Sequence, residues 1–309
     1  MRVLVVGAGV TGLTCAVVAA EAGHLVDVLA RDLPLETTSA VAAAWWYPYL
    51  AEPADRVLAW SRRTYEVLAG LDGADAGVTM RRSVELLTDP EPEPWWASAV
   101  GVLAPLQDVP PGYAAGRVFE APVAHMPTYL DYLVRRLASS GGTVTRMALS
   151  ALPPGADAVV NASGLGSRLL AGDPSTTPVR GQVLRLPAVA GVDEVLLADR
   201  PGETTYVVPR GDDVIVGGTS DHGEWDLAPR TEDTTAILAR AVALVPALAG
   251  APVLGVRVGL RPGRPTVRLE REDRAGASPV IHCYGHGGAG VTTSWGCAEE
   301  VASLLDAVA

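Results

Sequence analysis

The chain has 309 residues, 49% hydrophobic and 19% charged, a composition typical of a soluble α/β protein with one large or two interlocked domains. Its formal net charge of −11 disfavours general nucleic-acid or anionic-membrane binders, so neither partner is expected. All 24 basic residues are arginines, which excludes mechanisms that need a catalytic lysine amine.

The 3 cysteines form no CxxC pair, so we expect no disulfide framework, no metal site and a reducing, cytoplasmic location. The apolar N-terminal run could resemble a signal peptide, but glycines interrupt it where a nucleotide-binding turn needs them. No other stretch reaches the ~18 apolar residues of a membrane span, and no membrane association is expected.

The N-terminal segment shows the pattern of a dinucleotide-binding unit. An apolar strand over residues 2–6 leads into the GxGxxG turn at 7–12 and a helix over 13–22. Asp32 follows the next strand, where this fold places an acid on a ribose hydroxyl. The pattern predicts nucleotide binding, although a tight packing turn is the alternative. Arg31 leaves a 2′-phosphate, and hence NADP, open.

Hydroxyl, small and aromatic residues then follow one another. The hydroxyls of residues 37–39 predict a helix cap or a phosphate contact. Four aromatic residues within 45–49 come directly after the small residues of 40–44. The small residues would let the flat ring of a ligand lie close to the backbone, with the aromatic side chains on either side of it. Alternatively, these aromatic residues belong to the hydrophobic core.

The middle of the chain is predicted to be an insertion that interrupts the nucleotide-binding unit. We predict an amphipathic helix over residues 55–71 and an irregular segment over 72–127 with short strands at 84–87 and 116–119. A helix over 127–138 and a strand over 143–147 come next. A buried strand from Asp157 then enters a small-residue turn ending at Gly166, a further approach of backbone to the nucleotide layer.

The next segment is rich in strand signals. We expect a strand from 180 to 186, a hairpin over 203–219, a helix over 231–248 and a strand over 253–260. A Pro-containing turn over 261–268 follows. Arginines at 257, 261, 264, 268 and 271 have near-helical spacing, but the prolines forbid a helix. Two roles stay open for these arginines. They are solvated side chains at strand ends, or Arg261 binds a substrate carboxylate with two of its N–H groups.

The C-terminal segment again combines strand, bare turn and helix. Residues 280–284 predict a strand, the glycines of 285–290 remove side chains from the turn, and 292–305 form a helix. This arrangement makes a backbone amide cradle for an anion. His282 and His286 are expected to be structural or close to a cofactor rather than metal ligands.

These motifs together resemble the D-amino-acid oxidase family, including its D-aspartate oxidase branch, over nearly the whole chain. The last two segments are the most specific. The matching segments are Gly7–Gly12, 37–49, Val160–Gly164, Arg180–Gln182, Tyr206–Pro209, Gly259–Arg271 and 281–298.

The resemblance implies a non-covalent FAD enzyme that oxidises a D-amino acid by hydride transfer from Cα to the flavin. The products are a 2-oxo acid, ammonia and hydrogen peroxide. By the same resemblance, Arg261 and the Tyr206 hydroxyl bind the substrate carboxylate, the Gly288 carbonyl receives the amine, and Trp46 and Tyr47 line the substrate pocket. The implied FAD-binding residues are Gly7, Ala8, Gly9, Val10, Thr11, Gly12, Arg31, Asp32, Thr38, Ser39, Ala43, Ala44, Trp45, Ala148, Gly164, Gly287, Gly288, Ala289, Gly290, Val291 and Thr292.

The implied fold is α/β: a Rossmann-like FAD-binding domain interlocked with a second α+β substrate domain on a mixed or antiparallel sheet. Both domains are discontinuous, and a homodimer is a candidate state by analogy with the family. The expected FAD-binding domain comprises 1–48, 134–184 and 264–309, and the substrate domain comprises 49–133 and 185–263.

Alternatives stay open. An oxidase of acidic D-amino acids needs a further cation, for which Arg180, Arg200, Arg210 and Arg264 are candidates. Glycine or sarcosine oxidation uses the same chemistry. An NAD(P)-dependent dehydrogenase would explain the GxGxxG turn but not the C-terminal signature, and a non-catalytic nucleotide-binding protein would not need Arg261 and Tyr206 together.

Overall fold

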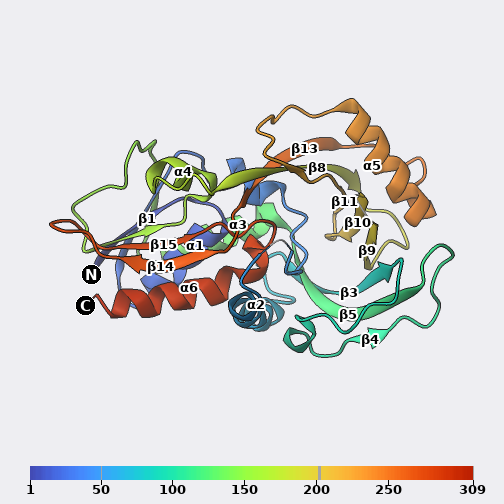
Figure 1. Cartoon of the computed structure of the whole chain (residues 1–309), viewed down its shortest axis with the longest axis horizontal. Helices are drawn as coiled ribbons and strands as arrows, with labels where there is room; N and C mark the ends of the chain where they lie inside the picture. Colours follow the sequence, from blue (N-terminus) through green and yellow to red (C-terminus); the bar gives the residue numbers. More distant parts are fainter. Residues whose placement is uncertain (50, 201–202, 309) are drawn as a thin grey trace.

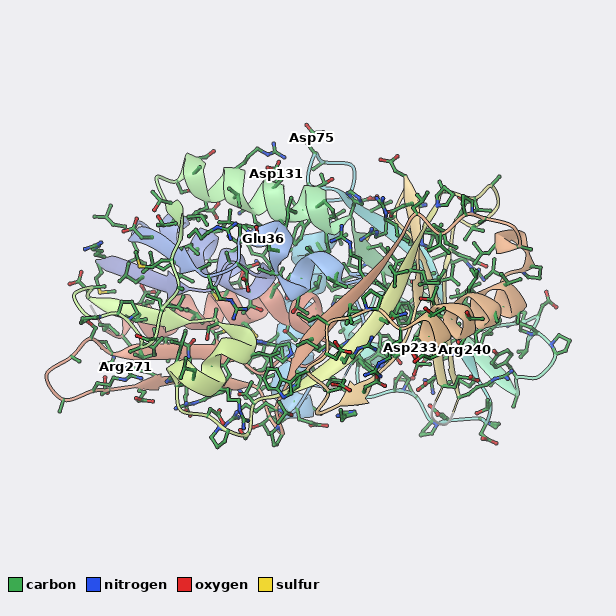
Figure 2. All side chains as sticks on the ribbon, turned by 90° about the horizontal axis from the view of Figure 1, so that it is seen from above. Glu36, Asp75, Asp131, Asp233, Arg240 and Arg271 are labelled. Atoms are coloured by element: carbon green, nitrogen blue, oxygen red, sulfur yellow. The ribbon has the colours of Figure 1, made fainter. Side chains whose placement is uncertain are left out.

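The computed structural model describes residues 1–49, 51–200 and 203–308. Its strands form two sheets that follow one another along the long axis of the molecule. Both chain ends lie beside the first sheet, at the left of Figure 1. Helix α5 lies over the second sheet, and Figure 2 shows Asp233 and Arg240 projecting from it. The arrangement confirms the predicted α/β class with a parallel sheet and a mixed sheet.

The first sheet has six strands in the order β14-β15-β7-β1-β2-β6. Apart from β14, which is antiparallel to β15, neighbouring strands are parallel, and the buried apolar run of β1 is typical of a central parallel strand. The strands are β1 (Arg2–Val6), β2 (Leu25–Ala30), β6 (Thr143–Arg146), β7 (Ala158–Asn161), β14 (Arg268–Glu272) and β15 (Val280–Tyr284).

Helices cover one face of this sheet with the largest apolar core of the molecule. The opposite face packs against Leu149, Leu152 and Leu170. Helix α2 crosses α6 closely because Gly296 has no side chain: a Cβ there would lie 2.4 Å from the Cα of Trp60. The helices on the first face are α1 (Val10–Glu21), α3 (Met126–Ser139) and α6 (Gly290–Asp306), with α2 (Ala54–Ala69) against α6.

The second sheet has nine strands, and most of its neighbouring pairs are antiparallel. One face packs against α5 (Thr231–Leu244), and the other faces a cavity between the sheets. Its strands are β3 (Val78–Leu87), β4 (Ala104–Pro105), β5 (Ala115–Ala124), β8 (Thr177–Pro187), β9 (Val195–Arg200), β10 (Glu203–Pro209), β11 (Asp213–Gly217), β12 (Asp221–His222) and β13 (Gly255–Gly263).

Short helical turns connect these elements. They are the 3₁₀ turns Pro34–Glu36, Thr38–Val41, Ala97–Ala99, Gly164–Gly166 and Pro246–Leu248, and the one-turn helix α4 (Ser167–Leu170). Among the described residues, no helix combines the length and apolar character needed to cross a bilayer.

Three sequence predictions about elements were wrong in extent. The segment predicted as irregular contains two ten-residue strands, β3 and β5, which pair along their whole length. Helix α5 ends at Leu244, and Pro246 starts a separate 3₁₀ turn because proline cannot continue the ladder. Strand β13 runs through Arg261 to Gly263, and its Pro262 is tolerated because β13 pairs only with β8 among the described strands.

The proposed boundaries of the two domains stay a prediction. The strands of the first sheet all come from the segments assigned to the FAD-binding domain. Helix α2, assigned to the other domain, nevertheless packs into the core of the first sheet.

Candidate active site

A large cavity lies over the carboxyl ends of the central parallel strands. The turns that follow β1, β7 and β15 all line it, as expected where parallel strands end at one edge of a sheet. Its volume is about 2120 Å³, which is larger than the ~300–1,000 Å³ of most small-molecule pockets. The cavity therefore has room for a large ligand, or for a cofactor together with a substrate.

The first turn places the beginning of α1 at the cavity. Gly7 has a φ of +116°, and a Cβ there would lie 2.4 Å from the carbonyl oxygen of Ala162. The Val10 amide donates a 2.9 Å hydrogen bond to Ser39 Oγ, and the N-cap residue Gly9 provides no side-chain cap. The positive end of α1 is thus open toward the cavity and suited to an anion.

The acid predicted to bind a ribose hydroxyl lies at the cavity wall, already paired with its neighbour. Arg31 Nε is 3.0 Å from Asp32 Oδ1, and Arg31 Nη2 is 2.6 Å from Asp32 Oδ2. The Arg31 side chain is 78% exposed, so solvent weakens this pair. A ribose contact would have to share the Asp32 carboxylate with Arg31.

The aromatic cluster divides between cavity and core. The Trp45 and Tyr47 rings stack with centroids 4.7 Å apart, and both residues line the cavity. Trp46 points the other way, as alternation in extended backbone requires. It is fully buried, donates from Nε1 to the Ser61 carbonyl at 3.0 Å and contacts the cavity nowhere. The expectation that Trp46 lines the substrate pocket is therefore corrected, whereas Tyr47 does line the cavity.

A buried carboxylate faces the cavity beside Tyr47. Glu85, in β3, accepts a 2.6 Å hydrogen bond from the Tyr47 hydroxyl and a 3.1 Å bond from Arg117 Nη1. Burial raises the pKa of Tyr47 well above its usual range, and the negative charge of Glu85 adds to the rise. The sequence analysis missed Glu85, although a charged residue inside the apolar run of β3 was a signal.

Tyr206 and Arg261 lie on the face of the second sheet that is turned away from α5. Both side chains rest on glycines that leave room for them. A Cβ at Gly217 would lie 2.2 Å from Tyr206 Cζ, and one at Gly181 would lie 2.3 Å from Arg261 Nη1. Arg261 Nη1 donates to the Thr219 carbonyl at 3.1 Å. The bare floor holds a phenol and a guanidinium flat beside each other at the cavity.

The C-terminal glycine turn closes the cavity from the first sheet. Gly288 lines it, and a Cβ at Gly288 would lie 2.6 Å from Tyr49 Cδ1. Thr292 Oγ1 accepts from the Tyr47 amide at 3.1 Å and donates to the Tyr47 carbonyl at 3.0 Å. The turn is therefore joined to the aromatic segment.

Comparison with known proteins places this geometry in a family. A family model described as "FAD dependent oxidoreductase" (DAO) matches residues 2–304, nearly the whole chain. The chain belongs to this DAO family. It is therefore an FAD-dependent oxidoreductase, as the resemblance predicted.

Relatives within the DAO family are similar over almost their full length. A protein named D-amino-acid oxidase from Rubrobacter xylanophilus is 50% identical over 99% of this chain and 96% of its own. A D-amino-acid oxidase from Streptomyces coelicolor is 42% identical over 98% and 96%. Human D-aspartate oxidase is 39% identical over 98% and 94%. A glycine oxidase structure from Geobacillus kaustophilus, 20% identical with a TM-score of 0.82 over 99% of this chain and 95% of its own, shares the fold.

The cavity fits the FAD of this family. The positive end of α1 lies at the cavity and suits a pyrophosphate, and three glycine-containing turns bring bare backbone to the cavity. Of the residues implied for cofactor and substrate, those that line the cavity are Gly7, Ala8, Gly9, Val10, Thr11, Arg31, Asp32, Thr38, Ser39, Ala43, Ala44, Trp45, Tyr47, Ala148, Gly164, Tyr206, Arg261, Gly287, Gly288, Gly290, Val291 and Thr292.

Gly12 and Ala289 do not line the cavity, contrary to the implied contacts. A Cβ at Gly12 would lie 2.0 Å from the Gly7 carbonyl oxygen, so this glycine lets α1 pack against its own turn. Ala289 is fully buried behind the glycine turn. Both residues shape the turns that line the cavity, but neither faces the cavity itself.

Three potential donor side chains gather behind the C-terminal turn. The donor atoms of Cys283, His286 and Cys297 all lie within 4.8 Å of one another, and all three residues are buried. Burial lowers the pKa of His286 to about 4, which keeps its ring neutral. The sequence analysis did not foresee this grouping, and its expectation of no metal site stays a prediction.

Proposed function

We propose that this chain converts a D-amino acid, oxygen and water into a 2-oxo acid, ammonia and hydrogen peroxide. The observation that carries the proposal is the pairing of Arg261 and Tyr206 on a glycine floor at the cavity. FAD, when bound, would supply the hydride acceptor for the substrate Cα–H and the route of the electrons to oxygen. The protein then has to bind, orient and desolvate the substrate.

Arg261 is the proposed carboxylate receptor. A guanidinium presents several N–H donors in one plane, and Nη1 of Arg261 donates to the Thr219 carbonyl. The rest of the fork remains for a two-point contact with a carboxylate. Burial raises the pKa of Tyr206, so its hydroxyl stays protonated near neutral pH and can donate a further bond.

The amine is assigned to the Gly288 carbonyl, across the cavity from this floor. If the amine enters deprotonated, no side chain needs to remove a proton from it. A carboxylate on Arg261 and an amine on Gly288 fix two of the four Cα substituents. With the Cα–H toward the flavin, only one direction remains for the side chain, which would select one enantiomer.

We infer a neutral rather than an acidic substrate. Glu85 and Asp199 both line the cavity and would repel a second carboxylate that lay near them. Among the candidate cations, Arg180 lies next to two aspartates, Arg210 pairs with Asp213, and Arg264 pairs with Asp173. Arg200 alone of the four lines the cavity, and it lies 4.9 Å from the Tyr113 ring.

One experiment separates the candidate activities. The purified protein is expected to be yellow with a flavin absorbance, and D-alanine is expected to bleach it without oxygen faster than D-aspartate, glycine or L-alanine does. A colourless protein that does not take up FAD, or bleaching by L-alanine alone, would overturn the proposal. Bleaching by D-aspartate alone would assign the acidic branch, and bleaching by glycine alone would assign glycine oxidation.

A cellular location and an assembly state complete the proposal. The three buried free thiols suit a reducing cytoplasm, and a cytoplasmic location is proposed. A homodimer is proposed by analogy with the family alone. Size-exclusion chromatography with light scattering tests the second proposal.

A further inference from the structure

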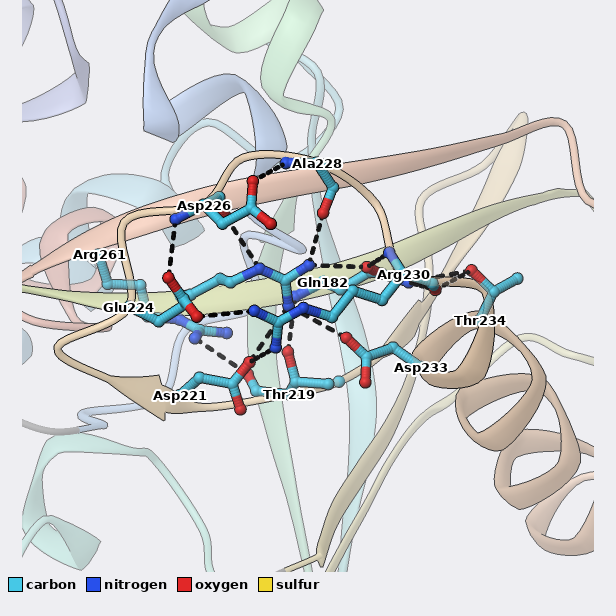
Figure 3. Close-up of polar contacts among 12 residues, drawn as sticks. Gln182, Thr219, Asp221, Glu224, Asp226, Ala228, Arg230, Asp233, Thr234 and Arg261 are labelled. Carbon is cyan, nitrogen blue, oxygen red and sulfur yellow. Dashed lines mark hydrogen bonds and ion pairs between the residues drawn. The ribbon is translucent and has the colours of Figure 1, made fainter.

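A charged side chain lies fully buried on the far face of the glycine floor. Arg180, in β8, has 0% of its side chain exposed. Its guanidinium donates to the backbone carbonyls of Asp226 and Ala228 at 3.0 and 2.8 Å, and Nη1 also reaches carboxylate oxygens of Asp221 and Asp233 at 3.2 and 3.1 Å (Figure 3). Removing a buried cation from water is costly, so these contacts must offset a large desolvation penalty.

Gln182 extends the same cluster from two positions further along β8. Its Oε1 accepts from Arg180 Nη2 at 3.1 Å and from the Arg230 amide at 2.8 Å. Its Nε2 donates to the Arg230 carbonyl and to Thr234 Oγ1, both at 2.9 Å (Figure 3). The two side chains thereby fasten the loop from Thr219 to Arg230, and the start of α5, to a central strand.

The fastened loop holds the proposed carboxylate receptor at its other end. Thr219 Oγ1 accepts a 2.9 Å hydrogen bond from the backbone N–H of Gln182, and the Thr219 carbonyl accepts the 3.1 Å bond from Arg261. Figure 3 shows Arg261 at the left of the cluster, joined to Thr219, with Arg230 and Thr234 at the right beside α5. Gly181, which lies between Arg180 and Gln182 in sequence, forms the floor under the Arg261 guanidinium.

Alternation along β8 explains this division. Arg180 and Gln182 point to the α5 face, as do the buried Leu184 and Leu186, whereas Gly181 turns to the cavity. Holding the loop in place would not by itself require a fully buried arginine. Apolar residues of similar volume would hold it without the free-energy cost of removing a charge from water. Through Asp221, two residues beyond Thr219, the polar cluster instead restrains the backbone that carries the Thr219 carbonyl.

We propose that Arg180 and Gln182 are positioning residues that orient Arg261 for carboxylate binding through the Thr219 carbonyl. This inference rests on the proposed function, because it presupposes that Arg261 binds the substrate carboxylate. The loop from Thr219 to Arg230 is then part of the substrate site, although Arg180 and Gln182 never touch substrate.

Two variants of Thr219 test how its carbonyl is held. T219V removes the hydroxyl that accepts from the backbone N–H of Gln182, whereas T219S keeps it. T219V should raise KM for D-alanine, and Kd for benzoate as a simple carboxylate, about tenfold, which corresponds to one lost hydrogen bond near a charged group. The value of kcat at saturating substrate and the affinity for FAD should change less than about twofold. T219S should restore wild-type values.

Variants of the cluster itself complete the test. R180K and Q182L should raise both constants in the same way, and T235V is the matched control because Thr235 Oγ1 donates only to the Thr231 carbonyl on exposed α5. Equal benzoate affinity in wild type, T219V and Q182L would overturn the inference, as would a loss of FAD in parallel with benzoate. If R261A also binds benzoate as wild type does, the proposed function itself fails. If R261A loses benzoate while T219V and Q182L keep it, only the inference fails.

Discussion

The Tyr47 hydroxyl donates a 2.6 Å hydrogen bond to the Glu85 carboxylate, from a position 38 residues earlier in the chain. Arg117 donates to the other oxygen of the same carboxylate, and both members of that ion pair are almost fully buried. This triad closes the cavity wall on the side of the aromatic segment. It joins the residue expected in the substrate pocket to the second sheet.

Glu85→Ala should lower the free energy of unfolding by about 1–3 kcal/mol, because Arg117 would lose its buried carboxylate and keep, among the described residues, only the Pro92 carbonyl and the exposed Glu91, 3.5 Å away. Glu85→Gln keeps the shape and part of the hydrogen bonding, so it should cost clearly less. Urea unfolding followed by circular dichroism measures both. Equal stability of Glu85→Ala and wild type would contradict the buried triad.

Arg261→Ala should keep FAD but raise KM for D-amino acids steeply. Breaking one side of a buried arginine–carboxylate pair costs about 2–5 kcal/mol, which corresponds to more than tenfold in affinity. Arg261→Lys retains the charge without the planar fork and should fall between the two. Steady-state kinetics together with flavin absorbance tests this, and a near-normal KM in Arg261→Ala would remove Arg261 from the substrate site.

Gly288→Ala should reduce activity before it weakens FAD binding. The added methyl would lie 2.6 Å from Tyr49 Cδ1, so either the ring or the turn must shift. The double variant Gly288→Ala with Tyr49→Leu should recover part of the activity relative to Tyr49→Leu alone. Loss of FAD ahead of turnover would instead indicate that the turn mainly binds cofactor phosphate.

Acidification should destabilise the fold in part through His286. Burial lowers its pKa to about 4, whereas an unfolded histidine titrates near 6.5. Between these values the unfolded state binds more protons, so the free energy of unfolding falls as pH drops from about 6.5 toward 4, by up to about 3 kcal/mol. His286→Gln lacks this term. As pH falls, the free energy of unfolding should therefore decrease more for wild type than for His286→Gln. Thermal unfolding of both proteins at pH 7 and pH 5 measures this difference.

Local patterns predicted the cofactor side of the site. The turn at 7–12 and the glycine turn at 285–290 depend on backbone freedom and on adjacent strands and helices, which neighbouring residues specify. For the same reason the α/β class and the order of the main elements followed from periodicity. The long strands β3 and β5 did not, because their pairing partners, rather than local alternation, stabilise them.

Side-chain direction and partners depended on the tertiary structure. The sequence placed Trp46 and Tyr47 together in the substrate pocket, but adjacent residues in extended backbone face opposite ways, and packing decided that Trp46 enters the core. Likewise, Thr292 bonds Tyr47 across 245 residues.

By itself, then, the sequence determined that this protein has two backbone cradles and a family signature that implies FAD. Only the tertiary structure showed that Glu85 faces the cavity and that Arg180 lies buried behind Arg261. The physical reason is range: a turn is specified by the few residues that form it. The cost of burying a charge is instead offset by partners that folding brings from distant parts of the chain.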